Sequence, residues 1–304
     1  MVLIPISPCC LKGGVLTGET RGRMEPKTVD RKISRYHTFP VGGEGAVRDK
    51  QKAVVLFTDP GGLGTPNPKI IADALAEALK LNVYVPEYFP KTLPHELIDG
   101  VAPIYPDEYA NRSWLYTIWL WITTLWKIRN YLPMMLSPNT QIPLAQAALN
   151  DLKAEGYTSL GAIGYCRGAA IILHLMSIAQ TNRTNSDSNS SSEQIQDGSS
   201  ILDIGVLCHP SPERKTYGNI TKPTSWQLPD HDPFMTFKEI AYLRPILEKK
   251  QEEEGIDFEV VVHKDTVHGF ASRPTLDHEP TKEAFENANQ NAVNFFNKHF
   301  FGKE

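Results

Sequence analysis

A short apolar run that turns sharply at a cysteine between two glycines constrains this chain most. Residues 160–164 are apolar or small, Cys166 stands between Gly164 and Gly168, and a small, then apolar run of helical character follows. This is the sequence form of a strand, a tight turn and a helix, with a nucleophile on the turn. Side chains at the flanking positions would collide with the strand and the helix, which explains the glycines. The usual Gly-x-Ser-x-Gly pattern is present with Cys166 in place of serine.

Buried strands and amphipathic helices alternate along the rest of the chain. Continuous apolar runs of this length are typical of strands buried on both faces of a parallel sheet. We therefore expect an α/β fold, a mostly parallel sheet with helices on both faces. A pair of short edge strands is expected within 28–41, and Asn67 is expected to cap the first helix. The expected strands are 52–58, 82–86, 160–164, 201–208, 221–228 and 258–263, and the expected helices start at Asn67 and Gly168 or span 144–155, 237–247 and 282–300.

Three segments stand outside this alternation. Residues 1–30 are predicted to be an extended arm, and 31–304 a single domain. A Ser/Asn/Asp-rich run at 181–200 is predicted to be a flexible surface insertion. The aromatic segment around 107–140 has a helical trend with apolar residues all round, which indicates a lid or pocket wall. The alternative is a helix buried between the core and the amino-terminal arm.

Charge and composition exclude several classes of partner. The 304 residues carry a net charge of -4, with a pI near 6.2, which argues against nucleic acid or an acidic membrane surface. The most apolar segment, 114–126, falls short of the roughly 20 residues that cross a bilayer. Four cysteines do not make a disulfide framework in a chain of this length. We expect a cytoplasmic monomer or homodimer that acts on a small molecule.

The candidate catalytic residues follow predicted strands. In open α/β sheets, active groups gather at the carboxyl ends of the strands. Cys166, Asp232 and His268 occur in the chain order nucleophile, acid, histidine. Asp230 is the alternative acid, because Asp232 precedes a proline and would also make a good helix N-cap. A cysteine in an apolar context is also often core filler, which is how we interpret Cys208.

Several motifs together resemble one family. They are Gly164-Tyr165-Cys166-Arg167-Gly168, the Asp59 loop, Val85-Pro86 and Val267-His268-Gly269-Phe270. Over residues 28–300 the chain resembles the dienelactone hydrolase family, especially its fungal branch. The resemblance implies an α/β-hydrolase fold, hydrolysis of an enol-lactone or similar ester, a Cys-Asp-His triad, and no metal or organic cofactor.

The resemblance also implies roles for residues around the nucleophile. The Arg167 N–H would donate to the oxyanion, but Pro60 stands where the family has a second donor and has no N–H. Gly61 or Gly62 would then supply that donor after a local rearrangement. Asp59 occupies the position of an acidic residue that contacts the resting nucleophile. The proposed substrate-binding residues are Asp59, Tyr165, His209 and Arg273, the last as a loose counterpart of the arginines that hold a substrate carboxylate.

The thiol restricts the reaction. A tetrahedral adduct expels its weaker base, so an ordinary alkoxide is retained and the thiolate leaves. Enolates, phenolates and thiolates compete well, which favours enol-lactones, aryl esters or thioesters. Two alternatives remain: a hydrolase-fold binding or scaffold protein without turnover, and an acyltransferase or thioesterase in secondary metabolism.

Overall fold

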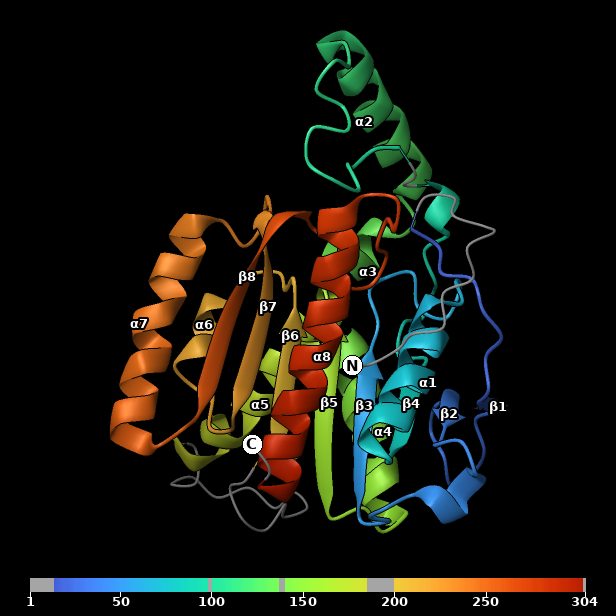
Figure 1. Ribbon diagram of the computed structural model, residues 1–304, viewed down its shortest axis with the longest axis vertical. Coiled ribbons are helices and arrows are strands. Elements are labelled where there is room, and N and C mark those ends of the chain that lie inside the picture. Colours follow the sequence, from blue (N-terminus) through green and yellow to red (C-terminus); the bar gives the residue numbers. More distant parts are fainter. Residues whose placement is uncertain (1–13, 98–99, 137–139, 185–199, 303–304) are drawn as a thin grey trace.

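The structure is a computed structural model that describes residues 14–97, 100–136, 140–184 and 200–302 (Figure 1). The strands are β1 (Arg23–Glu25), β2 (Arg35–Thr38), β3 (Lys52–Phe57), β4 (Asn82–Pro86), β5 (Ser159–Tyr165), β6 (Ile204–Cys208), β7 (Thr224–His231) and β8 (Phe258–Val267). The helices are α1 (Asn67–Leu79), α2 (Trp114–Ile128), α3 (Leu132–Leu136), α4 (Gln141–Ala154), α5 (Arg167–Thr184), α6 (Arg214–Tyr217), α7 (Phe237–Glu254) and α8 (Glu279–Phe301), with 3₁₀ turns η1 (Gly43–Ala46) and η2 (His95–Leu97).

The strands form one eight-stranded sheet in the order β1-β2-β4-β3-β5-β6-β7-β8. From β4 to β8 every neighbouring pair is parallel, whereas β1 and β2 pair antiparallel at one edge. Strand β4 pairs with one side of β3, and the next strand in the chain, β5, pairs with the other side of β3. The topological switch point therefore lies between β3 and β5. The predicted α/β fold with a mostly parallel sheet is confirmed.

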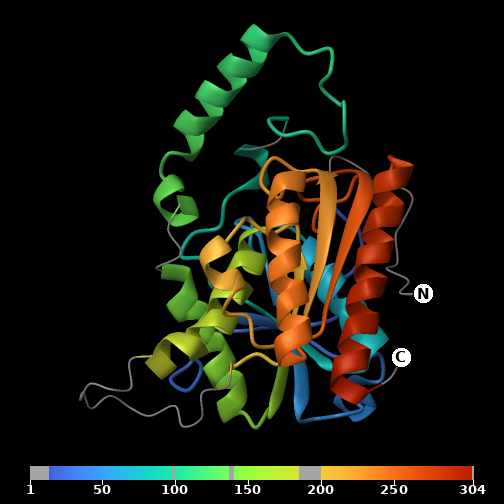
Figure 2. The ribbon, with the colours of Figure 1, turned by 90° about the vertical axis from the view of Figure 1, so that its left-hand side faces the viewer.

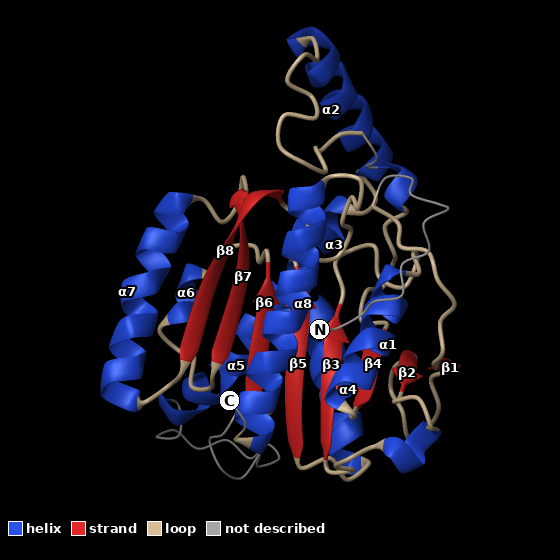
Figure 3. Cartoon of the chain, in the orientation of Figure 1, coloured by secondary structure: helices blue, strands red, loops and turns tan. Residues whose placement is uncertain are grey.

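Helices cover both faces of the sheet, as Figure 3 shows. The apolar stripes of α1 and α8 pack on one face, with Leu75 and Phe296 fully buried there. On the other face, α4, α5 and α7 bury residues such as Leu149, Ile171 and Leu243. The central strands therefore meet apolar side chains on both sides, which explains their continuous apolar runs.

The amino-terminal segment contributes the sheet edge. The first edge strand is β1, inside the segment predicted to be an arm and earlier than the expected range 28–41, while β2 lies within that range. Glu25 explains where β1 forms, because its carboxylate accepts hydrogen bonds from Arg35 at 2.9 Å and pairs with His37 at 2.9 Å. Pairing with Arg35 and His37 on β2 fixes the register of this short strand.

Asn67 has a different role from the predicted one. Pro66 occupies the N-cap position of α1, and Asn67 is the first residue of the helix. Its buried side chain accepts a hydrogen bond from the N–H of Leu16 at 2.8 Å and donates to the carbonyls of Gly14 at 2.7 Å and Ser272 at 2.8 Å. The amide therefore fastens residues 14–16 to the loop after β8, a use that the helix-start pattern could not reveal.

Helix α2 is the predicted aromatic insertion and projects from the end of the molecule that carries the carboxyl ends of the strands (Figures 1 and 2). Thr124 and Ile128 are its buried residues, whereas Trp114, Trp119 and Trp126 are each more than half exposed. The alternative of a helix buried between core and arm is therefore wrong, and closure over a pocket stays a prediction. Within the described residues, no helix has the length and apolar content needed to cross a membrane. Most of the predicted insertion at 181–200 lies outside the described residues.

Candidate active site

Residues predicted to form the site follow neighbouring strands of the sheet. Asp59 stands two residues after β3, and Cys166 directly follows β5. His209, Asp232 and His268 directly follow β6, β7 and β8 in the same way. Because these strands are parallel neighbours, their carboxyl ends meet at one edge, next to the switch point between β3 and β5.

The nucleophile turn has the strained backbone that the sequence predicts. Cys166 has a φ of 52°, a left-handed conformation that is uncommon for residues other than glycine. A Cβ on Gly164 would lie 2.6 Å from the backbone nitrogen of Ala169, and one on Gly168 would collide with the carbonyl oxygen of Phe57. The Cys166 N–H donates to the Cys208 carbonyl at 3.0 Å, which ties the turn to β6. The thiol is partly exposed, whereas Cys208 is buried.

Asp232 holds His268 while it also caps the turn after β7. Its Oδ2 lies 2.9 Å from Nδ1 of His268, and its side chain is completely buried. Its Oδ1 accepts hydrogen bonds from the N–H groups of Phe234 at 2.7 Å and Met235 at 3.3 Å. The capping and catalytic interpretations of Asp232 are thus compatible, because each oxygen serves one of them.

The electrostatics of His268 link it to the thiol. Burial lowers the pKa of His268. The charge of Cys166 and the hydrogen bond to Asp232 raise it by more than burial lowers it, so the pKa is about 10. Nε2 of His268 is buried and has no geometrically satisfactory hydrogen-bond partner among the described residues. The ring is therefore anchored at Nδ1, close to Cys166, and has Nε2 available for proton transfer.

Asp230 serves the backbone instead of His268. Its two carboxylate oxygens accept hydrogen bonds from the N–H groups of Asp265 and Thr266, each at 3.1 Å. Asp230, His231 and Asp265 also have potential metal-ligand atoms within 4.8 Å of one another. His231 and Asp265 are exposed, and the carboxylate of Asp230 is already used by the backbone, so this cluster is not a convincing metal site.

The loop after β3 uses the two amides that were predicted to complete the oxyanion hole. The Gly61 N–H donates to Oδ1 of Asp59 at 2.8 Å, and the Gly62 N–H donates to the Asp59 carbonyl at 2.9 Å. By contrast, Arg167 is the first residue of α5, so its N–H has no carbonyl partner within that helix. Of the three N–H groups predicted for the oxyanion hole, those of Gly61 and Gly62 are therefore occupied in this conformation, and that of Arg167 has no partner within its helix.

Asp59 connects this loop to the residues after His268. Its Oδ2 accepts a hydrogen bond from the Ser272 hydroxyl at 3.3 Å and lies 3.6 Å from Nε of Arg273. The structure thus brings Asp59 and Arg273 together, as an ion pair. Ser272 was not identified from the sequence, because a lone serine in a loop carries no distinctive pattern.

Two other predicted substrate-binding residues, His209 and Tyr165, are buried. The ring of His209 is fully buried, lies 4.8 Å from that of His268 between centroids, and has no hydrogen-bond partner for either nitrogen among the described residues. Burial, followed by the charges of His268 and Arg273, holds its pKa well below 6.5. Tyr165 is 2% exposed and packs in the core with its ring centroid 6.1 Å from that of His209. In this conformation both residues support the site from below.

Two neighbours of the site were not identified from the sequence. Phe234 packs edge-on against His268, with ring centroids 5.0 Å apart, and is half exposed. Gln141, buried at the start of α4, accepts a hydrogen bond from Nε of Arg167 at 3.0 Å. The position of Phe234 two residues after Asp232 was the available signal, whereas nothing in the sequence linked Gln141 to Arg167.

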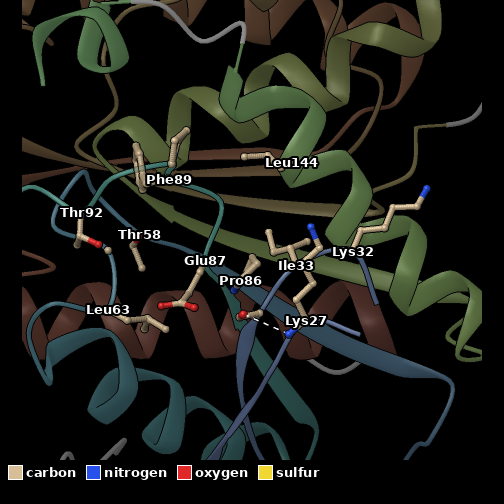
Figure 4. Close-up of a pocket in the computed structure, with 13 residues that line it drawn as sticks. Lys27, Lys32, Ile33, Thr58, Leu63, Pro86, Glu87, Phe89, Thr92 and Leu144 are labelled. Atoms are coloured by element: carbon tan, nitrogen blue, oxygen red, sulfur yellow. Dashed lines mark hydrogen bonds between the residues drawn. The ribbon is translucent and has the colours of Figure 1, made fainter. Parts of the chain in front are cut away.

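A cavity of about 380 Å³ lies beside the site, between the amino-terminal segment and the loops after β3 and β4 (Figure 4). Thr58 and Gly62 line it, so it borders the Asp59 loop, and Lys27, Lys32 and Glu87 are its charged lining residues. None of Cys166, Asp232 and His268 lines it. The cavity lacks a set of reactive groups comparable to the thiol on the strained turn and the paired histidine.

Comparison with known proteins finds relatives over nearly the whole chain. The model of the dienelactone hydrolase family matches residues 40–300. Hydrolase pyvD of Aspergillus violaceofuscus is 24% identical over 98% of this chain and 99% of its own length. Hydrolase tropI of Talaromyces stipitatus is 22% identical over 98% of both chains.

Solved structures show the same fold. A dienelactone hydrolase-like promiscuous phosphotriesterase, P91, from metagenomic libraries aligns with a TM-score of 0.57 and 17% identity, over 93% of this chain and 99% of its own. A dienelactone hydrolase homologue from Klebsiella pneumoniae aligns with a TM-score of 0.56 and 13% identity, over 91% of this chain and 98% of its own. At these identities the likeness establishes the fold.

Proposed function

Because the chain belongs to the dienelactone hydrolase family and is a carboxylic ester hydrolase, we propose that it cleaves an enol-lactone or similarly activated ester through Cys166, Asp232 and His268. The observation that carries the proposal is the buried 2.9 Å contact between Asp232 and His268, beside a thiol on a strained turn. An anchored imidazole next to a partly exposed nucleophile is the arrangement that covalent acyl transfer requires.

In the acylation step, the thiolate of Cys166 attacks the acyl carbon, and the carbonyl electron pair moves to oxygen. The Arg167 N–H at the start of α5 stabilises that oxyanion, with help from the positive end of the helix. The adduct then collapses, the carbon–oxygen bond to the leaving group breaks, and protonated His268 gives its Nε2 proton to the departing enolate. The result is a thioester on Cys166 and an enol, which stays attached to the acyl chain when the substrate is a lactone.

In the deacylation step, the electrostatics of His268 change in the required direction. The negative charge of Cys166 is one of the causes that raise the pKa of His268. Acylation removes that charge, so the pKa of His268 falls and the neutral ring becomes available as a base. His268, held by Asp232, takes a proton from water, which attacks the thioester and releases the acid. The regenerated thiolate raises the pKa of His268 again.

The substrate class follows from the leaving group. Comparing kcat/KM for a nitrophenyl ester and an ethyl ester of the same acid tests it. We expect strong preference for the nitrophenyl ester in the wild type, because thiolate is expelled in preference to ethoxide. The matched variant Cys166→Ser should show a smaller preference. Equal turnover of the two esters by the wild type would contradict the proposal.

One observation favours a second candidate, a binding protein without turnover. The N–H groups of Gly61 and Gly62 are both occupied by Asp59, so the oxyanion hole has one donor until that turn rearranges. Measuring alkylation and turnover together separates the candidates. Rapid, stoichiometric iodoacetamide labelling of Cys166 with nitrophenol release that disappears in Cys166→Ala supports the hydrolase. Slow iodoacetamide labelling of Cys166 without nitrophenol release supports the binding protein.

A further inference from the structure

The most exposed apolar feature of the described chain is α2. Its exposed large residues are Trp114, Leu115, Tyr116, Ile118, Trp119, Trp121, Ile122, Leu125 and Trp126, with exposed fractions from 46% to 69%. Single apolar residues on a surface are ordinary, but a contiguous patch of this kind marks an interaction site. Nothing in the proposed hydrolytic mechanism uses it.

The exposed residues lie on one side of the helix. At about 100° per residue, all of them except Tyr116 fall within an arc of roughly 160°. The opposite side carries the more polar residues Thr117, Thr123, Thr124 and Lys127, together with Tyr116, Leu120 and Ile128, and Thr124 and Ile128 are buried there. The polar side thus includes the contacts near the body, and the apolar side faces outward.

The charges around α2 indicate what this surface meets. Arg112, Lys127 and Arg129 are the charged residues between positions 109 and 150, although Asp107 and Glu108 directly precede this segment, in a chain whose net charge is -4. Arg112 lies over the Tyr109 ring at 3.3 Å and Arg129 over the Trp126 ring at 4.3 Å. Cations therefore flank a tryptophan-rich apolar face at both ends.

We propose that α2 is an interfacial anchor that lies in the headgroup region of an anionic lipid membrane. Tryptophan and flanking Lys or Arg are the residues favoured at membrane–water interfaces, and an amphipathic helix with such a face lies in the interface plane. At 15 residues the helix is about 22 Å long, too short for a hydrocarbon core of about 30 Å. A second copy of the chain fits less well, because the two cationic segments would face each other.

This proposal revises the expectation that the protein has no membrane partner and does not depend on the proposed reaction. The net charge of the chain led to that expectation, yet the local charge of α2 has the opposite sign. The helix also rises from the edge of the sheet that carries the carboxyl ends of the strands (Figure 1), so membrane contact would bring that edge toward the bilayer.

The tryptophans provide a direct probe. Of the five, Trp114, Trp119, Trp121 and Trp126 belong to α2, and the fifth, Trp226, is fully buried in β7. The experiment titrates the protein with vesicles of phosphatidylcholine and phosphatidylserine and records tryptophan emission, quenching by brominated lipid, and co-sedimentation. We expect a blue shift, quenching and co-sedimentation for the wild type.

Matched variants test the assignment. Ile118→Asp with Ile122→Asp leaves every tryptophan in place. This double change should weaken vesicle binding at least about tenfold, because two apolar side chains that the membrane interface would bury are lost. Val41→Asp with Phe237→Asp changes two exposed apolar residues elsewhere and should bind like the wild type. Lys127→Glu and Arg129→Glu should each weaken binding to the anionic vesicles about fivefold or more.

Other outcomes would overturn the proposal. They are the absence of a shift and of co-sedimentation with anionic vesicles, equal weakening by the control pair, and binding that is insensitive to Lys127→Glu and Arg129→Glu. A blue shift that grows with protein concentration without lipid, together with a dimer that the Ile118 and Ile122 changes abolish, would assign the surface to a second copy instead.

Discussion

Oδ2 of the fully buried Asp232 lies 2.9 Å from Nδ1 of His268. This contact fixes which ring nitrogen faces the carboxylate and leaves Nε2 on the other side of the ring. Because Oδ1 of Asp232 is already held by the N–H groups of Phe234 and Met235, the carboxylate cannot rotate away from the ring without losing those bonds.

The first prediction concerns the choice of acid. Asp232→Asn should lower kcat for a nitrophenyl ester by about 10³ to 10⁴, since a neutral amide no longer stabilises the imidazolium or selects the tautomer. The amide oxygen can still cap Phe234, so the fold should persist. Asp230→Asn is the matched control and should change kcat little, because Asp230 contacts the N–H groups of Asp265 and Thr266 and the exposed ring of His231, and not His268. Equal, small effects of the two changes would exclude Asp232 as the acid.

The second prediction concerns the pH dependence of stability. The pKa of His268 is about 10 in the folded protein and 6.5 in the reference state, so protonated His268 favours folding. Its contribution is fully present below pH 6.5 and is lost as the pH rises towards 10. Denaturant unfolding over this range should show the wild type losing stability relative to His268→Gln as pH rises. A difference that does not change with pH would contradict the raised pKa of His268.

The third prediction tests the packing of the nucleophile turn. Gly168→Ala should abolish turnover or prevent folding, because its Cβ would collide with the Phe57 carbonyl at the end of β3. Gly218→Ala is the control, since Gly218 has a φ of -65° and open space around it. Thermal unfolding and ester turnover measured for both variants check this. Normal turnover in Gly168→Ala would show that the turn does not pack as described.

The fourth prediction concerns the attachment of residues 14–16. Asn67→Ala removes the bonds to Gly14, Leu16 and Ser272 and should cost about 1 to 3 kcal/mol of the free energy of unfolding. Limited proteolysis should then cut near residue 16 faster than in the wild type. Asn111→Ala, in an exposed loop, is the control and should behave like the wild type. Unchanged proteolysis of Asn67→Ala would mean that the amide does not hold this segment.

The sequence predicted the central part of the fold because local patterns determine it. The apolar runs of β3 to β8 and the glycines around Cys166 reflect burial and steric limits that act within a few residues. The role of Asn67 was missed because its partner Ser272 lies in a distant segment of the chain. The position of β1 was missed because it depends on charged pairs such as Glu25–Arg35, which have no periodic pattern in the sequence. Composition alone also could not reveal that the apolar side of α2 faces outward.

The sequence predicted about as much of the candidate site as it did of the fold. Chain order and strand ends placed Cys166, Asp232 and His268 at one edge, and the structure brings Asp232 and His268 into contact there. It could not be foreseen that Asp59 occupies the N–H groups of both Gly61 and Gly62, since this depends on the fine geometry of one turn.

The most direct test of the account is the mass of the protein during turnover. Rapid acid quenching of a reaction with a nitrophenyl ester, followed by intact-mass measurement and peptide mapping, should find one acyl group attached to Cys166. Asp232→Asn should accumulate more of it, because deacylation needs an oriented His268. Turnover without any acyl group on Cys166, or with the acyl group on another residue, would contradict the account.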